Sequence, residues 1–261
     1  MATPVTVKSA VVCADPKIVV ASDFLTFEEC EHFKSLGRQH GMQRAKLVGK
    51  KTGVDVTTNE RTNASCWLPH DVSPTAKAVV ERISSFVGIP AANAEQIQLI
   101  YYQPGQFYLA HYDGWAVSGP NEPEPAFGSE AHILKERYMD GQGGQRMLTT
   151  LVYLNTLPVG TGGETEFPNL TMVEPAAAAA AAHPSQPAPP LKPRNRVLKV
   201  YPEMGKMVCF SNVYAGTHTL HPNSLHMGST VGQVVDSVTG ELVQAEKWAF
   251  NLWYRESAAR H

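Results

Sequence analysis

The chain has 261 residues, and its 22 basic and 24 acidic side chains give a formal net charge of −2 at neutral pH. This balance excludes a broad basic surface for nucleic acid, and the sequence has no run of the roughly 18 apolar residues that a membrane span needs. Hydrophobic residues make up 43% of the chain and charged residues 18%, an ordinary globular composition at a length that can bury a large core.

The N-terminal residues and the cysteines indicate the compartment. Residues 1–7 lack a positive region followed by an apolar region, so we expect no signal peptide and a cytoplasmic protein. The cysteines are widely scattered and form no C-x-x-C pair; they are Cys13, Cys30, Cys66 and Cys209. We therefore expect free thiols rather than structural zinc or a disulfide scaffold.

A short strand and two helices are predicted in the N-terminal part. Residues 17–23 have the pattern of a buried strand. A helix is predicted over 26–39, because Thr26 and Glu29 have the spacing of a capping box. A second helix is predicted over 73–87, where a Ser-Pro pair begins the segment and Gly-Ile-Pro follows it.

From about residue 95 the pattern changes to short strands. The predicted strands are 97–102, 107–113, 147–154, 199–201, 206–210 and 247–254. Because no helices separate them, they favour a β-sandwich or barrel over a parallel α/β sheet. We expect one domain over 1–261, in which residues 1–95 support a β core formed by residues 96–256.

Two stretches do not fit a compact core. Residues 114–142 are polar and contain Gly and Pro, a pattern typical of functional or disordered loops. Residues 175–193 contain seven consecutive alanines, at 176–182, and several prolines. We interpret 175–193 as a low-complexity hairpin extension that carries no chemistry.

A candidate metal site begins at His111 and Asp113. Side chains at i and i+2 of a strand point to the same face, so this imidazole and this carboxylate converge. They would supply two of the three ligands of a non-haem Fe(II) centre. The pattern alone is weak, because an H-x-D also arises by chance. Its third ligand stays open among His218, His221 and His226.

The predicted last strand carries a second signal. Its alternate residues Trp248, Phe250, Leu252 and Tyr254 form an apolar face, while Lys247 belongs to the opposite face with smaller side chains. A lysine in this position either points into a barrel mouth and holds a carboxylate, or is a solvated edge residue.

Six sequence blocks carry a resemblance to a known family. They are, in order, residues 102–113, 143–146, 153–154, 162–168, 224–228 and 247–248. With Arg61-Thr62 before them, these blocks closely resemble the prolyl 4-hydroxylase family of 2-oxoglutarate/Fe(II)-dependent dioxygenases over residues 18–256. The resemblance implies an α+β fold that is mainly β with flanking helices. Its core would be a double-stranded β-helix, a jelly-roll barrel with N-terminal buttressing helices.

The resemblance also implies three sets of site residues. The implied iron ligands are His111, Asp113 and His226. The residues implied to bind the distal carboxylate of 2-oxoglutarate are Lys247, Tyr102 and Thr165. The residues implied to face the substrate are Arg146, Tyr108 and Trp248. We count Lys247 with the three ligands as catalytic, since it holds the cosubstrate.

The chain departs from the family pattern after the last histidine. The family's H-x-G-x-P-V reads His226-Met-Gly-Ser-Thr-Val here, without the proline. Lys247 lies 21 positions after His226, farther than is usual in the family. We interpret residues 232–242 as an inserted hairpin that leaves the lysine anchor in place.

The predicted function is an Fe(II)- and 2-oxoglutarate-dependent dioxygenase that hydroxylates a peptidyl proline and releases succinate and CO2. Expected cofactors are Fe(II), 2-oxoglutarate and ascorbate. The expected partners are a proline-containing peptide or protein and molecular oxygen, with no nucleic acid and no membrane. Two alternatives stay open: the same chemistry on a free amino acid or another protein side chain, and an inactive jelly-roll that binds Pro-rich peptides. The four intact catalytic residues argue against the inactive form.

Overall fold

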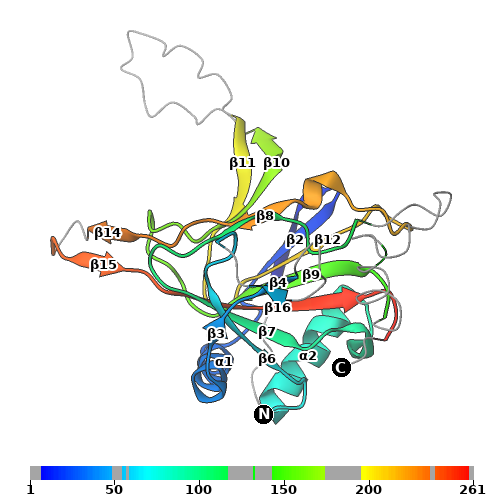
Figure 1. Cartoon of the computed structure of the whole chain (residues 1–261), viewed down its shortest axis with the longest axis horizontal. Coiled ribbons are helices and arrows are strands. Elements are labelled where there is room, and N and C mark those ends of the chain that lie inside the picture. The colour runs from blue at the N-terminus through cyan, green and yellow to red at the C-terminus, as the bar shows by residue number, and fades with distance from the viewer. Residues whose placement is uncertain are drawn as a thin grey trace, which may run out of the picture.

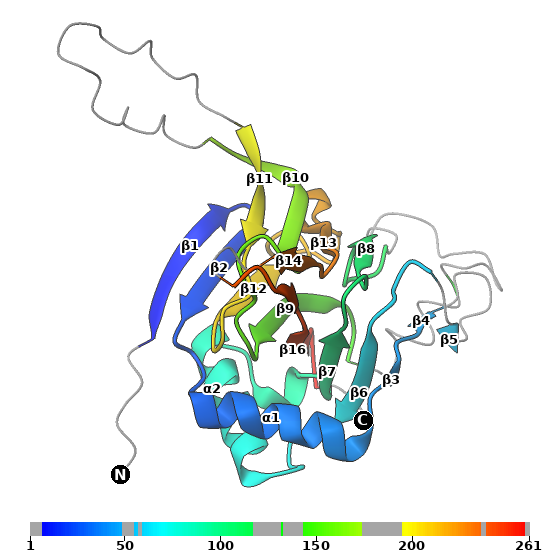
Figure 2. The ribbon, with the colours of Figure 1, turned by 90° about the vertical axis from the view of Figure 1, so that its left-hand side faces the viewer.

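Two antiparallel β-sheets lie face to face, and two helices cover the outer face of the larger sheet (Figure 1, Figure 2). The structure is a computed structural model that describes residues 7–48, 55–56, 59–116, 132, 143–173, 195–235 and 239–258. Within these ranges no helix is long and apolar enough to cross a membrane. The predicted fold class, mainly β with flanking helices, is confirmed.

The larger sheet has eight strands. Their order is β1 (Lys8–Ala14), β2 (Lys17–Ser22), β12 (Met207–Ser211), β9 (Arg146–Tyr153), β16 (Lys247–Arg255), β7 (Ile97–Tyr102), β6 (Ala64–Leu68) and β3 (Gln43–Arg44). The smaller sheet has the order β11 (Asn195–Val200), β10 (Thr165–Val173), β13 (His226–Gly228) and β8 (Tyr108–His111). Two isolated pairs complete the strands: β4 (Leu47–Val48) with β5 (Asp55–Val56), and β14 (Gln233–Val235) with β15 (Leu242–Gln244).

Both predicted helices form, with the ends that their sequences predict. In α1 (Phe27–His40), the Thr26 side chain accepts from the Glu29 backbone and the Glu29 carboxylate accepts from the Thr26 backbone, which completes the capping box. Ser73 caps α2 (Pro74–Val87), and Gly88 ends it in the left-handed conformation. Among the described residues, the short 3-10 helices η1 (Ala91–Asn93) and η3 (Pro222–Ser224) lie in connections.

Strand β16 contributes to two separate cores. Trp248 and Phe250 belong to the core between the large sheet and the helices, where the Phe250 ring lies 4.7 Å from that of Phe33 on α1. Ala249 belongs to the core between the two sheets, together with Phe210. The alternation predicted for this strand is therefore confirmed, and Lys247 lies on the side that faces the small sheet.

Several strands differ from their predicted bounds. β8 covers Tyr108–His111 rather than 107–113, so Asp113 follows the strand. β11 begins at Asn195, earlier than the predicted 199–201. The edge strand β1 and the three-residue β13 were not predicted, because an exposed edge has no regular apolar alternation and three residues are too few to show a period.

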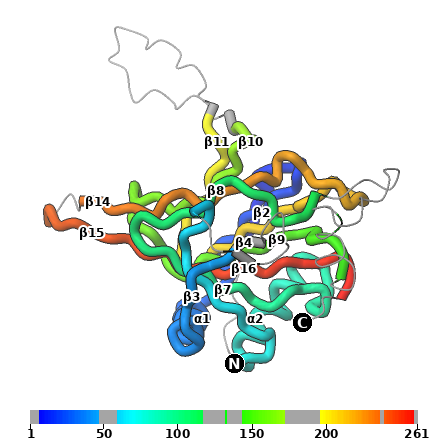
Figure 3. Tube along the Cα trace, viewed as in Figure 1, coloured from blue at the N-terminus to red at the C-terminus, as the bar shows by residue number. Residues whose placement is uncertain are grey.

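The predicted hairpin at 232–242 is confirmed as β14 and β15, which project from the two sheets (Figure 3). The Ala245 N–H donates to the Gly232 carbonyl at 3.3 Å and closes the base of the hairpin. The chain therefore re-enters the sheet two residues before Lys247. Of the two stretches that do not fit a compact core, 175–193 lies outside the described residues, as does 114–142 apart from 114–116 and 132.

Gly37 on α1 allows the helix to approach the sheet closely. A Cβ at this position would lie 2.9 Å from Cζ3 of Trp248 and closer still to Leu99 Cδ2. We predict that Gly37→Val lowers the free energy of unfolding by about 1–3 kcal/mol, because overpacking forces the sheet and helix apart. Chemical denaturation measures this, with the exposed Gln39→Ala as the control on the same helix. Equal stability of Gly37→Val and the wild type would contradict the close approach.

Candidate metal centre and anion anchor

Three potential ligands converge where β8 and β13 pair. One donor atom each from His111, Asp113 and His226 lies within 4.8 Å of the others. His111 and His226 are opposite each other in the strand register, and their ring centroids are 4.3 Å apart. The two Nε2 atoms lie 3.6 Å and 3.5 Å from the two carboxylate oxygens of Asp113.

The second nitrogen of each imidazole is bonded to backbone. His111 Nδ1 lies 2.8 Å from the Leu109 carbonyl, and His226 Nδ1 lies 3.0 Å from the Ser224 carbonyl. A carbonyl only accepts, so each Nδ1 carries the proton and each Nε2 presents a lone pair. Burial, with His111 alongside, lowers the pKa of His226 to about 4, so this ring is neutral at pH 7. Two imidazoles and one carboxylate on one face fit a non-haem Fe(II).

A bulge in β8 packs Tyr108 against the metal centre. His226 is opposite His111 and Gly228 is opposite Tyr108, so one intervening residue of β13 lies opposite two of β8. The bulge turns Tyr108 and His111 to the same side, where their rings stack at 3.5 Å and 14°. The Arg61 guanidinium lies 4.7 Å from the other side of the tyrosine ring. Tyr108 is thus beside a candidate ligand, although sequence reasoning did not anticipate Arg61 behind it.

Lys247 provides a buried positive charge. Its side chain is 2% exposed, and Nζ donates one hydrogen bond, to the Gly163 carbonyl at 2.7 Å. Nζ also lies 5.3 Å from the Tyr102 ring and 5.4 Å from the Tyr153 ring. Burial lowers the pKa of Lys247 to about 8. An ammonium has three donors, so this group is suited to hold a carboxylate.

Two hydroxyls accompany the lysine. Tyr102 is opposite Lys247 in the strand register, and its hydroxyl lies 3.5 Å from where a Cβ on Gly228 would be, beside β13. Tyr153 donates its hydroxyl proton to Thr165 Oγ1 at 2.7 Å, which leaves the Thr165 proton for another acceptor. The three predicted anchor residues therefore lie together. Tyr153 was missed, although its two-residue alternation with Leu151 along β9 indicates an inward position.

Arg146 lies beside the metal centre, and the Glu95 carboxylate binds its guanidinium. Its Nε and NH2 donate to the two oxygens of Glu95 at 2.6 and 2.7 Å, and its NH1 lies 3.3 Å from the Asp113 carbonyl. The guanidinium carbon is 3.9 Å from the centre of the Trp253 ring. Arg255 also contacts Glu95. Burial opposes ionisation of Glu95, but the two guanidiniums outweigh it and lower its pKa.

Trp248 does not line this site, contrary to the sequence-based expectation. Its ring lies 4.4 Å from that of Tyr101, and the Arg38 guanidinium lies 5.5 Å from it, on the helix side of β16. Neighbouring residues of a strand point to opposite faces, so Trp248 points away from the side that holds Lys247. Trp253, five residues later, lies against Arg146, as does Trp115, whose ring centre is 5.0 Å from the guanidinium carbon.

The other two candidate histidines are bound elsewhere. His218 Nε2 lies 2.9 Å from Glu256 Oε1. His221 Nε2 lies 3.0 Å from Asp15 Oδ1. Only His226 of the three therefore joins His111 and Asp113.

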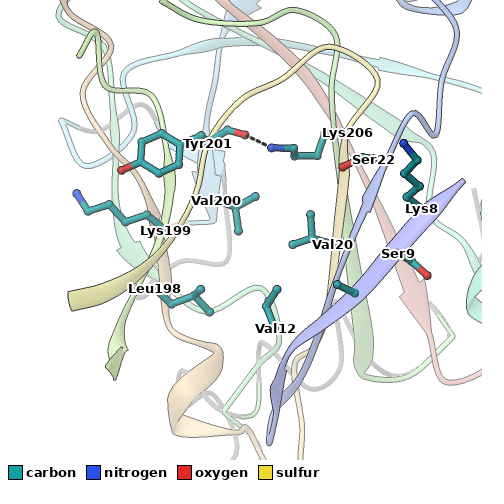
Figure 4. Close-up of a pocket in the computed structure, with 11 residues that line it drawn as sticks. Lys8, Ser9, Val12, Val20, Ser22, Leu198, Lys199, Val200, Tyr201 and Lys206 are labelled. Atoms are coloured by element: carbon teal, nitrogen blue, oxygen red, sulfur yellow. Dashed lines mark hydrogen bonds between the residues drawn. The ribbon is translucent and has the colours of Figure 1, made fainter. Parts of the chain in front are cut away.

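A separate groove of about 350 Å³ lies between β1, β2 and β11 (Figure 4). Its lining includes the apolar side chains of Val12, Val20 and Leu198 and the lysines Lys8, Lys199 and Lys206. None of the candidate ligands or anchor residues lines this groove. It is therefore distinct from the metal centre.

Sequence comparison relates the chain to one superfamily. The profile of the 2OG-Fe(II) oxygenase superfamily matches residues 97–255. Prolyl 4-hydroxylase 5 of Arabidopsis thaliana is 31% identical over 249 residues, which cover 94% of this chain and 70% of that protein. Prolyl 4-hydroxylase 1 of the same plant is 38% identical over 164 residues, or 62% of this chain and 50% of that protein.

Structural comparison supports the fold. A viral collagen prolyl hydroxylase from Paramecium Bursaria Chlorella virus-1 matches with a TM-score of 0.56 and 21% identity, over 98% of this chain and 97% of the viral one. A prolyl hydroxylase from Trichoplax adhaerens matches with a TM-score of 0.52 and 15% identity, over 92% of this chain and 83% of the other. The predicted jelly-roll, or double-stranded β-helix, is thereby confirmed.

We predict that His226→Ala abolishes binding of a divalent metal, because it removes one of three converging donors. Anaerobic titration with Co(II), followed by visible absorption, measures this. His218→Ala is the matched control, since its imidazole contacts Glu256 and not the cluster. Loss of Co(II) binding in His218→Ala with retention in His226→Ala would refute the assignment.

Proposed function

This chain belongs to the 2OG-Fe(II) oxygenase superfamily, and on that premise we propose that it hydroxylates a proline held in a peptide. It is a 2-oxoglutarate- and Fe(II)-dependent dioxygenase of the prolyl 4-hydroxylase type. One observation carries the choice of substrate: its relatives at about 30% identity over most of the chain are prolyl 4-hydroxylases. The proposed reaction consumes oxygen and 2-oxoglutarate and yields hydroxyproline, succinate and CO2.

The metal would be held by Nε2 of His111, a carboxylate oxygen of Asp113 and Nε2 of His226. Ferrous iron held by these three ligands on one face would supply open coordination positions, where oxygen could be activated at the expense of 2-oxoglutarate for attack on an unactivated C–H bond. The protein fixes its ligands before the metal arrives, since both Nδ1 atoms are already bonded to backbone carbonyls. The 2-oxoglutarate cosubstrate would bind next to the metal, so its second carboxylate needs an anion-binding site close to β13.

Lys247 would supply that site. The Lys247 ammonium would bind the distal carboxylate of 2-oxoglutarate, with the Tyr102 and Thr165 hydroxyls as further donors. Tyr153 holds the Thr165 oxygen by donating to it, so the Thr165 proton would be available to the carboxylate. The apolar surroundings strengthen each of these charge-assisted bonds, because little water competes with them.

The substrate peptide would lie on the side of the metal centre bounded by Tyr108 and Arg146. A polyproline II segment leaves its backbone carbonyls unpaired, and it is already extended, so binding orders it little. Arg146 donates three hydrogen bonds to Glu95 and the Asp113 carbonyl. A guanidinium has five N–H donors, so Arg146 would still donate to a peptide carbonyl. Ascorbate would serve as a reductant that restores ferrous iron after uncoupled turnover.

The Lys247 anchor predicts a pH dependence. The free ammonium loses its proton near pH 8 rather than near 10.5, and a bound carboxylate stabilises the charged form. Above pH 8 binding must take up a proton, so the KM for 2-oxoglutarate should rise by up to about tenfold per pH unit. In Lys247→Ala we expect a KM at least about 30-fold higher at pH 7 and no such rise.

Succinate formation at several pH values measures both effects. Lys199→Ala is the control, since Lys199 pairs with Glu166 on the exposed side of the small sheet. An unchanged KM in Lys247→Ala would show that another cation binds the cosubstrate.

A comparison of substrates tests the proposed reaction. We expect a Pro-rich peptide to yield hydroxyproline and succinate in equal amounts, and free L-proline to yield neither above the background of His226→Ala. Mass spectrometry of the peptide and quantification of succinate measure the two products together. Coupled turnover of free proline alone would favour an amino-acid hydroxylase. Peptide binding without succinate would favour the inactive binding module.

A further inference from the structure

A continuous set of buried hydrogen bonds joins two of the three candidate metal ligands, and we propose that Asn212 is the positioning residue at its centre. Asp113 and His226 come from distant parts of the chain, and Asn212 at the end of β12 is bonded toward both. This inference rests on the proposed metal centre, because it concerns how the protein sets the distance between two of its ligands.

The first arm runs from Asn212 to Asp113 through Thr149. Thr149 Oγ1 donates to Asp113 Oδ2 at 2.8 Å. A hydroxyl has one proton, so Thr149 must act as acceptor toward Asn212, whose Nδ2 lies 3.0 Å away. Asn212 is 0% and Thr149 1% exposed, so no water replaces a lost bond. The arm therefore holds Oδ2 of Asp113 in place. Oδ1 belongs to the same rigid carboxylate and can turn only together with it.

The second arm runs from the same residue to His226. The backbone carbonyl of Asn212 accepts from the His221 N–H at 2.9 Å. The Ser224 hydroxyl donates to the His221 carbonyl at 2.7 Å and also lies 3.2 Å from the Asn212 backbone oxygen. The Ser224 carbonyl in turn accepts from His226 Nδ1 at 3.0 Å. The short helix η3 that leads into His226 is thus bonded to the residue that also positions Asp113.

An outer contact supports the second arm. His221 Nδ1 accepts from the Asn223 N–H at 3.1 Å, so its proton is on Nε2, which reaches Asp15 Oδ1 at 3.0 Å. Asp15 lies in the turn between β1 and β2. His221 is 2% exposed and does not join the metal ligands. Its contact with Asp15 connects η3 to the edge of the large sheet.

The geometry makes Asn212 a positioning residue rather than a ligand. Its side chain contacts Thr149 and not the converging donor atoms. The quantity that it controls is the 3.5 Å separation of His226 Nε2 from Asp113 Oδ2, because both arms end on those two residues. Outer residues of this kind usually change metal affinity by about 10-fold to 100-fold when they are replaced.

Two adjacent threonines on β9 allow a matched test. Thr149 donates to Asp113, whereas Thr150, which is equally buried, donates to the Leu252 carbonyl at 3.0 Å on the other face of the strand. Anaerobic titration with Co(II) gives the metal affinity, and thermal unfolding of the metal-free protein gives stability. We expect Thr149→Val and Asn212→Leu each to weaken Co(II) binding by about 10-fold to 100-fold. Thr150→Val should lower the melting temperature without this loss.

Two further variants test the route of the effect. Thr149→Ser retains the hydroxyl and should restore affinity to within about threefold of the wild type, even if Thr149→Val is poorly folded. The double variant Thr149→Val/Asn212→Leu should lose no more affinity than the weaker-binding single variant, because both changes break one arm. Additive losses, or equal affinity in Thr149→Val, Thr150→Val and the wild type, would overturn the proposal.

Co(II) binding by the wild type distinguishes failure of the proposed metal centre from failure of the positioning role of Asn212. If wild-type protein binds no Co(II), the proposed metal centre itself fails. If it binds Co(II) tightly and both Thr149→Val and Asn212→Leu do so as well, the metal centre stands and the positioning role of Asn212 is wrong.

Discussion

Burial of β16 on both of its faces is the constraint that organises this molecule. One face must be covered by α1 and α2, and the other must be covered by the small sheet, since neither the Phe250 side nor the Ala249 side is left to solvent. A strand at the centre of a two-layer protein therefore has a defined inner side. Lys247 begins the strand on that inner side, so the same alternation that builds the cores also places a charge between the two sheets.

The two buried charge systems beside the site differ in kind. Glu95 is shared by Arg146 and Arg255, so both guanidiniums of that cluster have the same carboxylate as a partner. Lys247 has a carbonyl and two aromatic rings around it, and burial lowers its pKa. The charge of Glu164 opposes this shift only in part, and a buried charge without full compensation opposes folding. A bound dicarboxylate would therefore stabilise the fold as well as take part in the reaction.

Local patterns in the sequence were sufficient for the capped helices, the alternation in β16 and the His111–Asp113 pair. The pair converges for a reason that differs in part from the predicted one, because Asp113 lies beyond the strand and a bulge reorients β8. Trp248 was misplaced, although its position next to Lys247 already put it on the opposite face. Contacts between distant segments, such as Glu95 with Arg146 and Asp15 with His221, have no local signature, since their partners meet only when the sheets form.

The closed base of the β14–β15 hairpin has a consequence for how such chains diverge. Gly232 and Ala245 are bonded to each other, so the segment between them leaves the sheets and returns to the same place whatever its length. Closing a longer loop costs only about 0.6 kcal/mol for each doubling of its length. Insertions here therefore leave the distance in space between His226 and Lys247 nearly unchanged, although they increase the number of residues between them. Relatives should be recognised by the pairing at this base, and a search that requires a set spacing between histidine and lysine would reject functional members.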